Sequence, residues 1–394
     1  MARSGALQRI LTLGALTAFA PMSIDMYLPG FTALQHDLHT TPGAVQRTLV
    51  VFFVGLALGQ AFWGAVSDRY GRKRPLLIGI ALYVLASLGC AMAASIDALM
   101  LWRLLQALGG CAGIVIARSM VRDLYAPVDA ARMFSRLTLV LGAAPILAPL
   151  AGAALVQSWG WRAIFLVLMV FGVICLLAAL ALPESLAPGS RSSAQQHPVR
   201  NAMRTYFDLL RDRRFIGFAL SGALGQSAMF AYIAGAPFVF MQVFGLSSAQ
   251  FAWVFGANAL GLIAASQINH ALLARVGSGV LLRRALLSLT VWASVMLALA
   301  VLKAGGLWGV VIPLFIALSS LGFSFPNATA LALAHQTGRV GSAAALIGSL
   351  QFTLAAASGS AVGVIAAHSA LPMAAVFCAF AGLALWANQR LAPR

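Results

Sequence analysis

The feature that most constrains this chain is a succession of twelve apolar stretches. Each holds about the 20 residues that a membrane-spanning helix needs. The stretches are continuous and rich in glycine, which is typical of membrane helices, whereas polar and apolar residues alternate along barrel strands. We expect helices at about residues 9–30, 44–66, 75–95, 98–119, 133–157, 161–182, 214–240, 248–270, 280–302, 306–331, 340–366 and 370–389.

The shortage of charged residues excludes a soluble enzyme and a nucleic-acid-binding module. Charged residues make up 9% of the 394 positions and hydrophobic residues 61%, whereas soluble domains carry about 25% charge. The net charge of +17 therefore indicates the basic loops of a polytopic membrane protein. The four cysteines and six histidines are scattered, so we predict no disulfide, metal site or cofactor. Because no phosphate loop or catalytic triad pattern occurs, we do not expect an enzyme.

Lys and Arg residues predict the orientation of the chain. If both termini are cytoplasmic, 21 of them fall in inner segments and three in outer loops, a bias that indicates a cytoplasmic N-terminus. One long polar segment, residues 184–213, separates six spans in residues 1–183 from six in residues 214–394. Residues 200–212 are able to form a short surface helix, although we expect an ordinary basic linker rather than a regulatory element.

Asp25 is the one acidic residue placed well inside an apolar stretch. A charge at the centre of a membrane helix costs at least about 2.5–3.5 kcal/mol, so such residues usually have a function or a partner. A structural carboxyl group held by hydroxyls or an arginine is the alternative. We expect Asp25 to carry protons or contact the substrate, because burial favours a protonated carboxyl group.

Two arginines lie inside the fourth stretch. Arg103 shares a helical face with Gln106, and we expect that face to line a central cavity, where Arg103 senses Asp25 or holds the substrate; snorkelling to the membrane surface is the alternative. Arg118, at the inner end, has the pattern of an interface anchor. In the second half, the candidate cavity residues are Gln226, Phe230, Tyr232, Asn258, Asn327 and Gln351, each of which is as well explained by bonds between helices.

A stripe of glycine and proline runs along the fifth stretch. Gly142, Pro145, Pro149 and Gly152 follow one another at spacings that place them on one helical face. Proline kinks a membrane helix and frees carbonyl groups, and glycine lets a neighbouring helix approach closely. The stripe predicts a hinge or a tight packing seam.

These motifs resemble those of the major facilitator superfamily. Its signature loop after the second helix is matched by Gly64, Asp68, Arg69, Gly71, Arg72 and Lys73. Residues 103–109 are similar to the helix 4 motif of drug:proton antiporters, and residues 142–152 to their helix 5 motif, with Ala144 where glycine is usual. Residues 23–29 and 118–123 resemble the bicyclomycin/chloramphenicol resistance subfamily. The specific motifs all fall in residues 23–152.

The resemblance implies a monomeric, all-α transporter of the bacterial inner membrane, with two six-helix halves that rock around a central cavity. Its partners would be the lipid bilayer, protons as the coupling ion and a small drug-like substrate. Asp25 and Arg103 would couple protons, and these two residues with Tyr27, Gln106 and Arg118 would contact the substrate. It also implies a latch, in which Asp68 faces the start of the eleventh helix and Arg72 pairs with Asp123. Topology signals alone are the alternative explanation of the latch residues.

The sequence is compatible with two further functions. A porter for a specific metabolite such as a nucleoside would use the same scaffold and Asp25, but the helix 5 motif favours antiport. A receptor or assembly factor without transport activity fits the composition, but leaves Asp25 and the latch unexplained.

Overall fold

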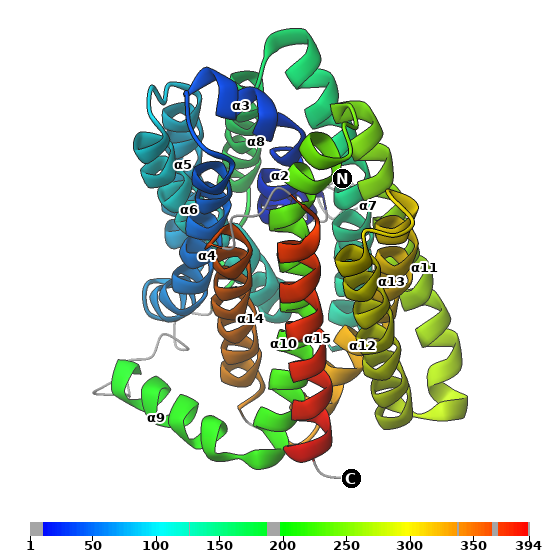
Figure 1. Ribbon diagram of the computed structural model, residues 1–394. Coiled ribbons are helices and arrows are strands. Elements are labelled where there is room, and N and C mark those ends of the chain that lie inside the picture. Colours follow the sequence, from blue (N-terminus) through cyan, green and yellow to red (C-terminus); the bar gives the residue numbers. More distant parts are fainter. Residues whose placement is uncertain (1–10, 126, 187–197, 337–338, 365–368, 393–394) are drawn as a thin grey trace. The chain divides into compact units, whose positions relative to one another are not determined.

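The computed structural model describes residues 11–125, 127–186, 198–336, 339–364 and 369–392, and every regular element in these ranges is helical (Figure 1). The segment Leu11–Thr17 is also helical. The further elements are α2 (Phe19–Asp25), η1 (Leu28–Gly30), α3 (Phe31–Asp37), α4 (Pro42–Tyr70), α5 (Lys73–Ala91), α6 (Ile96–Leu124), α7 (Pro127–Trp159), α8 (Arg162–Leu180), α9 (Pro198–Arg211), α10 (Arg213–Pro237), η2 (Phe238–Val243), α11 (Ser248–Val276), α12 (Ser278–Leu302), α13 (Trp308–Leu333), α14 (Val340–Val364) and α15 (Leu371–Arg390).

The number of spans agrees with the sequence. Within the described residues, eleven helices are long and apolar enough to cross a membrane, and a bent pair brings the number to twelve. The all-α membrane fold with twelve spans is thus confirmed. The first stretch differs in detail from the single helix expected at 9–30, because Leu11–Thr17 and Phe19–Asp37 meet at 44°. Pro21 has no N–H to donate to the carbonyl of Thr17, and this missing bond explains the bend.

The helices group into two compact units. The first comprises Met1–Thr40 and Val51–Arg200, and the second comprises Thr41–Val50 and Asn201–Arg394. In the first unit, α5 packs on α6 and α8, and α2 packs on α6 and α7. Glycines allow the closest approach, since a Cβ on Gly109 of α6 would lie 2.7 Å from the carbonyl oxygen of Gly79. Such contacts replace the hydrophobic effect as the source of packing between membrane helices.

The second unit is built around α10, which packs on α13, α14 and α15, while α12 packs on α13 and α15. Polar side chains cap the starts of α10 and α11. Asp212 accepts hydrogen bonds from the N–H groups of Arg214 and Phe215 at the start of α10. Ser247 and Gln250 form a reciprocal capping box at the start of α11. These caps satisfy N–H groups that have no partner inside the helix.

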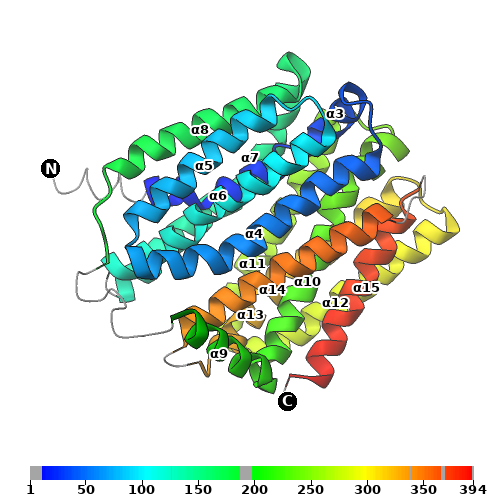
Figure 2. The same ribbon diagram turned by 90° about the vertical axis from the view of Figure 1, so that its left-hand side faces the viewer.

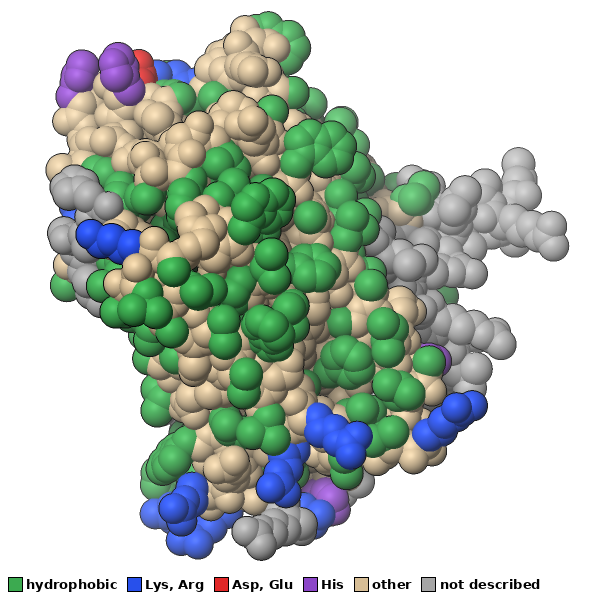
Figure 3. All heavy atoms as spheres, turned by 45° about the vertical axis from the view of Figure 1, so that its right-hand side comes forward, with side chains coloured by type: hydrophobic (Ala, Val, Ile, Leu, Met, Phe, Trp, Pro, Cys, Tyr) green, Lys and Arg blue, Asp and Glu red, His purple; other side chains and the backbone are tan. Residues whose placement is uncertain are grey.

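Apolar side chains cover much of the surface, as expected for a protein in contact with lipid (Figure 3). Leu287, Val291 and Trp308 of the second unit, for example, are all at least 40% exposed. Lys and Arg side chains gather along one edge of this view. Because consecutive spans alternate in direction, the exposed Arg275, Arg283 and Arg390 belong to the same end of the unit, where the positive residues of a membrane protein mark one side of the bilayer.

Candidate functional site

Asp25 ends the α2 helix, at the place where the first span changes from α-helix to the 3₁₀ turn η1. Its side chain is buried, with 4% exposed. Pro29 lies in η1 and fixes the backbone there. Asp25 is about 21 Å along the span from Leu11 and about 18 Å from Asp37, at 1.5 Å per residue. The helix break therefore holds a carboxyl group deep in the span, an arrangement that transporters use for substrate and coupling-ion sites.

Arg103 of α6 is fully buried. Its Nη1 donates to the carbonyl oxygen of Ser23, 3.1 Å away, and to Oε1 of Gln106 at 2.7 Å. The guanidinium carbon lies 4.6 Å from the ring centroid of Tyr27 and 4.1 Å from that of Phe52. Aromatic faces attract a cation most strongly where water is excluded. The arginine is therefore held by rings and carbonyl-type acceptors instead of a carboxylate.

A chain of hydrogen bonds continues from Arg103 into α5. Nε2 of Gln106 donates to the hydroxyl of Ser87 at 2.8 Å, and this hydroxyl donates to the carbonyl oxygen of Tyr83 at 2.7 Å. The phenol of Tyr83 shares a hydrogen bond of 2.8 Å with the hydroxyl of Ser23. The network closes a loop through three helices, so α2, α5 and α6 hold the surroundings of Asp25 in one arrangement.

Asp25 and Arg103 do not form an ion pair in the part of the chain that the structure describes. In the same part, Nε and Nη2 of Arg103 are buried without a hydrogen-bond partner. Arg118, on the same helix, has an exposed side chain and does not join this network. The first unit thus contains a buried carboxyl group and a buried guanidinium that are not paired with each other, and such groups inside membrane helices usually have a function.

The glycine–proline stripe belongs to α7, and Pro145 and Pro149 lie inside that helix. Gly152 packs on the backbone beside Asp25, since a Cβ on it would lie 2.1 Å from the carbonyl oxygen of Met26. Gly142 lies in the stretch Gly142–Trp159, which is apolar enough to span a membrane among the residues of α7 with described side chains. The stripe therefore forms a tight packing seam at Gly152, which lies directly against the chain where α2 ends.

In the second unit, the structure brings together two of the six predicted polar and aromatic residues. Nδ2 of Asn258 donates to the hydroxyl of Tyr232 at 3.1 Å, and the Tyr232 ring stacks on Phe255 with 5.5 Å between centroids. Both polar side chains are buried. This pair joins α10 to α11.

The other four predicted residues have different surroundings among the described residues. Asn327 donates to Oδ1 of Asn269 at 2.6 Å, a bond between helices of the type expected as the alternative. Phe230 packs on Phe352 at 5.9 Å between centroids. Among the described residues, Oε1 of Gln226 is buried without a partner, so it is free to accept a bond from a ligand. Gln351 of α14 is half-buried.

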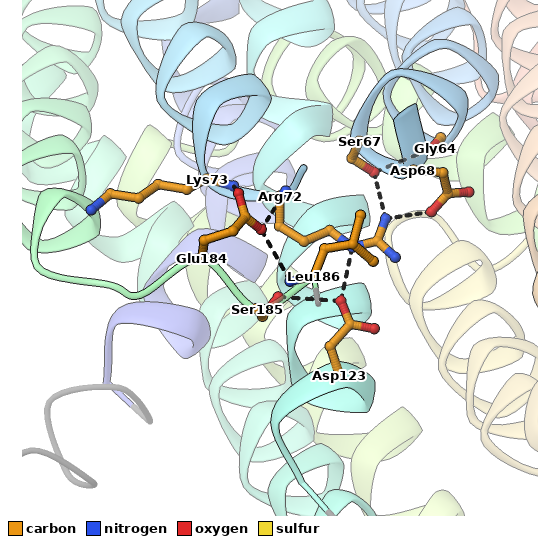
Figure 4. A network of polar contacts seen from close by, with 9 residues as sticks. All are labelled: Gly64, Ser67, Asp68, Arg72, Lys73, Asp123, Glu184, Ser185 and Leu186. Carbon is orange, nitrogen blue, oxygen red and sulfur yellow. Dashed lines mark hydrogen bonds and ion pairs between the residues drawn. The ribbon is translucent and has the colours of Figure 1, made fainter. Parts of the chain in front are cut away.

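The signature loop forms a cluster of charges at the end of α4 (Figure 4). Arg72 pairs with Asp123 as expected, with 2.9 Å between Nε and Oδ2. Its Nη1 also pairs with Asp68 and donates to the hydroxyl of Ser67 at 3.0 Å. Burial opposes the charge of Arg72, but these bonds outweigh it and raise its pKa. Arg69 lies outside the cluster, with its guanidinium 5.4 Å from the ring of Tyr70.

Glu184 completes the cluster from the far side. Its carboxylate accepts hydrogen bonds from the N–H groups of Arg72 at 2.8 Å and Lys73 at 3.2 Å, at the start of α5 (Figure 4). Burial acts to raise the pKa of Glu184, but the N–H donors of Arg72, Leu186 and Lys73 outweigh it and lower the pKa. A carboxylate is favoured at this position because the helix dipole is positive there.

Two neighbours of Glu184 extend this arrangement. Gly71 has a φ of +91°, which favours glycine, and a Cβ on it would lie 2.5 Å from Oε2 of Glu184. Ser185 donates to Oδ2 of Asp123 at 3.2 Å. Glu184 therefore fastens the polar segment after α8 to the signature loop, and Ser185 fastens it to the end of α6.

Sequence reasoning did not predict the roles of Glu184, Ser185, Ser67, Ser87 or Tyr83. The sequence signal for Glu184 was its place directly after a span, next to Pro183. The signal for the hydroxyl groups is weaker, since serine and tyrosine inside spans usually bond to their own helix or a neighbour. Only the packing of α5 on α6 shows that these groups meet Arg103.

Comparison with family models matches residues 13–360 to the Major Facilitator Superfamily. The chain is 36% identical over 367 residues to the Uncharacterized MFS-type transporter YdgK of Bacillus subtilis, covering 92% of this chain and 90% of that protein. It is 31% identical to a Bicyclomycin resistance protein homolog of Haemophilus influenzae, covering 92% and 91%. It is 28% identical to Multidrug resistance protein D of Escherichia coli, covering 89% and 87%.

Solved structures share the fold at low sequence identity. The D-xylose-proton symporter superposes with a TM-score of 0.75 at 14% identity, covering 98% of both chains. The nucleoside transporter NupG gives the same TM-score at 13% identity and the same coverage. Identity this low is evidence for the architecture, and says nothing about the substrate.

Proposed function

The chain belongs to the Major Facilitator Superfamily, and from this premise we propose that it is a proton-driven antiporter that exports drug-like compounds across the bacterial inner membrane. One observation carries the proposal: Asp25 is a buried carboxyl group at a helix break, next to a network centred on an arginine without a carboxylate partner. The names of two relatives, bicyclomycin resistance homolog and multidrug resistance protein, support export of antibiotics.

In the proposed cycle, a proton from outside binds Asp25 and the substrate leaves. When the site opens to the cytoplasm, the proton leaves and a new substrate binds near the carboxylate. Arg103 holds the backbone at Ser23, two residues before Asp25, so it keeps the carboxyl group in position through both states. Buried ionisable groups in membrane helices are characteristic of such proton relays.

Apolar surroundings and few polar groups suit a broad range of lipophilic substrates. In the second unit, we assign Gln226 as a hydrogen-bond acceptor for the substrate because its Oε1 is unpartnered. Tyr232 and Asn258 offer further polar groups, already bonded to each other. Asp68, Arg72 and Asp123 form the latch that opens and closes with the alternation of access.

The driving force is sufficient for useful export. A membrane potential of 100 mV supplies about 2.3 kcal/mol per charge, and one pH unit supplies about 1.4 kcal/mol. Together they support roughly a 500-fold gradient of a neutral compound for one proton.

The test is growth of an efflux-deficient bacterial host on a compound panel of antibiotics, lipophilic cations and nucleosides, with wild type compared with Asp25→Asn. Asp97→Asn is the control, because Asp97 is an exposed carboxylate at the start of α6. We expect wild type and Asp97→Asn to give resistance to the same compounds, and Asp25→Asn to lose it. The proposal fails if Asp25→Asn exports every substrate against a gradient as well as wild type. If transport by wild type affects growth only in the presence of nucleosides, the protein is a specific metabolite porter and not a drug exporter.

A further inference from the structure

The helix α9 (Pro198–Arg211) precedes the first span of the second unit and runs across the end of α10 rather than along it (Figures 1 and 2). Its side chains are described from Thr205 onward. Leu209 is fully buried and holds the helix against the protein. On the other side, Phe207 is 53% exposed and Leu210 is 44% exposed. Exposed apolar residues on a helix that is too polar to cross the bilayer need another cover.

The described part of α9 is amphipathic, with an apolar face and a polar face. Helical spacing places Tyr206, Phe207 and Leu210 within an arc of about 100°, and Asp208 points to the opposite side. The guanidinium of Arg211 lies 4.1 Å from the ring centroid of Phe207. This contact fixes a positive charge at the border of the apolar face, which is the pattern of helices that lie in the membrane interface.

Three arginines form a positive cluster where α9 meets α10. The side chains of Arg211, Arg213 and Arg214 are all exposed. The one acid among them, Asp212, is occupied by the N–H groups of α10 and by Nε2 of Gln336 at 2.9 Å. Burial acts to raise the pKa of Asp212, but the bonds from Gln336 and the backbone outweigh it and lower the pKa. Asp212 is thus used for capping, and the three arginines remain available to an external anion.

The position of the cluster identifies the anion. Arg213 is the first residue of a membrane span, so the three arginines lie at the boundary of the bilayer. Phe207 lies in the last turn of α9, four residues before its end at Arg211, and α10 begins two residues later at Arg213. Phe207 is therefore close to the same boundary. Phospholipid headgroups are the anions present there at high density, and juxtamembrane basic residues are attracted to an anionic bilayer surface.

We propose that α9 lies in the membrane interface and binds anionic phospholipids. Phe207 and Leu210 insert at the boundary between headgroups and acyl chains, and Arg211, Arg213 and Arg214 bind the phosphate groups. This surface does not depend on the transported substrate or on proton coupling. A neutral bilayer would cover only the apolar residues. An anionic lipid also complements the charge of the three arginines, and this complementarity favours it.

The test places an environment-sensitive fluorophore on Leu210→Cys or Asp208→Cys in the full-length protein, with labelled wild type as the blank because Cys90, Cys111 and Cys175 are buried and Cys378 is half-buried. Each protein is reconstituted into vesicles of phosphatidylcholine, with or without one quarter phosphatidylglycerol. We expect the Leu210 label to shift to the blue and to be quenched by brominated lipid at least twice as strongly with phosphatidylglycerol. The Asp208 label stays solvent-like in both.

A second arm tests the charges. The triple variant Arg211→Gln, Arg213→Gln, Arg214→Gln is compared with Arg283→Gln, Arg284→Gln, which removes exposed arginines at the start of α12. We expect the triple variant to retain several-fold less phosphatidylglycerol in native mass spectra, and the α12 variant to retain the wild-type amount. A Leu210 label that is solvent-like in both kinds of vesicle overturns the proposal. Equal shielding of this label from water in both kinds of vesicle also overturns it, because the helix would then bind neutral lipid equally well. Shielding in detergent that rises with protein concentration would assign the face to a second copy.

Discussion

Gly152 of α7 lies against the carbonyl oxygen of Met26, so closely that a Cβ on this glycine would stand 2.1 Å from the oxygen. The neighbouring atom is backbone, and it belongs to the residue after Asp25. Any side chain at position 152 must therefore push α7 away from the break that carries the carboxyl group.

We expect Gly152→Ala to reduce transport at least tenfold and to lower the melting temperature, since overpacking typically costs about 1–3 kcal/mol. Melting is measured in detergent with a thiol-reactive dye, because unfolding exposes the buried Cys90, Cys111 and Cys175. Gly382→Ala in α15 is the matched control, since its Cβ would meet nothing within 4 Å. Equal melting temperatures and transport in the two variants would show that α7 is free to shift.

For Arg103→Met, we expect stability and transport to change differently. The guanidinium is buried without a carboxylate, and two of its three nitrogens, Nε and Nη2, lack a partner in the described structure. Replacing such a group by an apolar one of similar length removes a desolvation penalty, so the melting temperature should stay within a few degrees of wild type or rise. Uphill transport should fall at least tenfold. A large drop in melting temperature would instead make Arg103 a structural residue.

Glu184→Gln should destabilise the protein in a pH-dependent way. The pKa of Glu184 lies below its usual value of 4.5, so its contribution is present above about pH 4.5 and is lost as pH falls through the lowered pKa. Because the side chain is exposed to solvent, we expect less than about 1 kcal/mol. The variant should melt slightly below wild type at pH 7 and equally in acid. Asp208→Asn, at an exposed carboxylate of α9, is the control. A gap that widens on acidification contradicts this role.

The number of buried carboxyl groups predicts the number of protons moved in each transport cycle. Of the acidic residues with described side chains, those other than Asp25 lie at or beyond the ends of the spans. We therefore expect one proton per cycle. Export of a monovalent cation from proteoliposomes should not respond to an imposed membrane potential, whereas export of a neutral compound should. Efficient, potential-driven export of a dication would require a second titrating group and disprove the prediction.

The sequence predicted what depends on local pattern. Hydropathy predicted the twelve spans, and the resemblance to the superfamily implied the pairing of Arg72 with Asp123 that the structure contains. The sequence did not predict that Glu184 caps the start of α5, because this contact joins residues that are far apart in the chain. In addition, a single glutamate after a span has no characteristic spacing that would indicate a cap. Asn327 was a candidate for the cavity, but it bonds to Asn269. The sequence could not distinguish these two roles, because an amide inside a span has the same sequence pattern in either one. The bend near Thr17 follows from Pro21, which the sequence contained.

The contact between Gly71 and Glu184 limits how this protein is able to evolve. Position 71 requires both a positive φ and the absence of a Cβ next to the Glu184 carboxylate. A mutation at 71 therefore has a different cost depending on the residue at 184, and a shorter side chain at 184 relieves only one of the two constraints. Substitutions at these sites should be epistatic, so relatives that have lost the glycine should also have changed the acid.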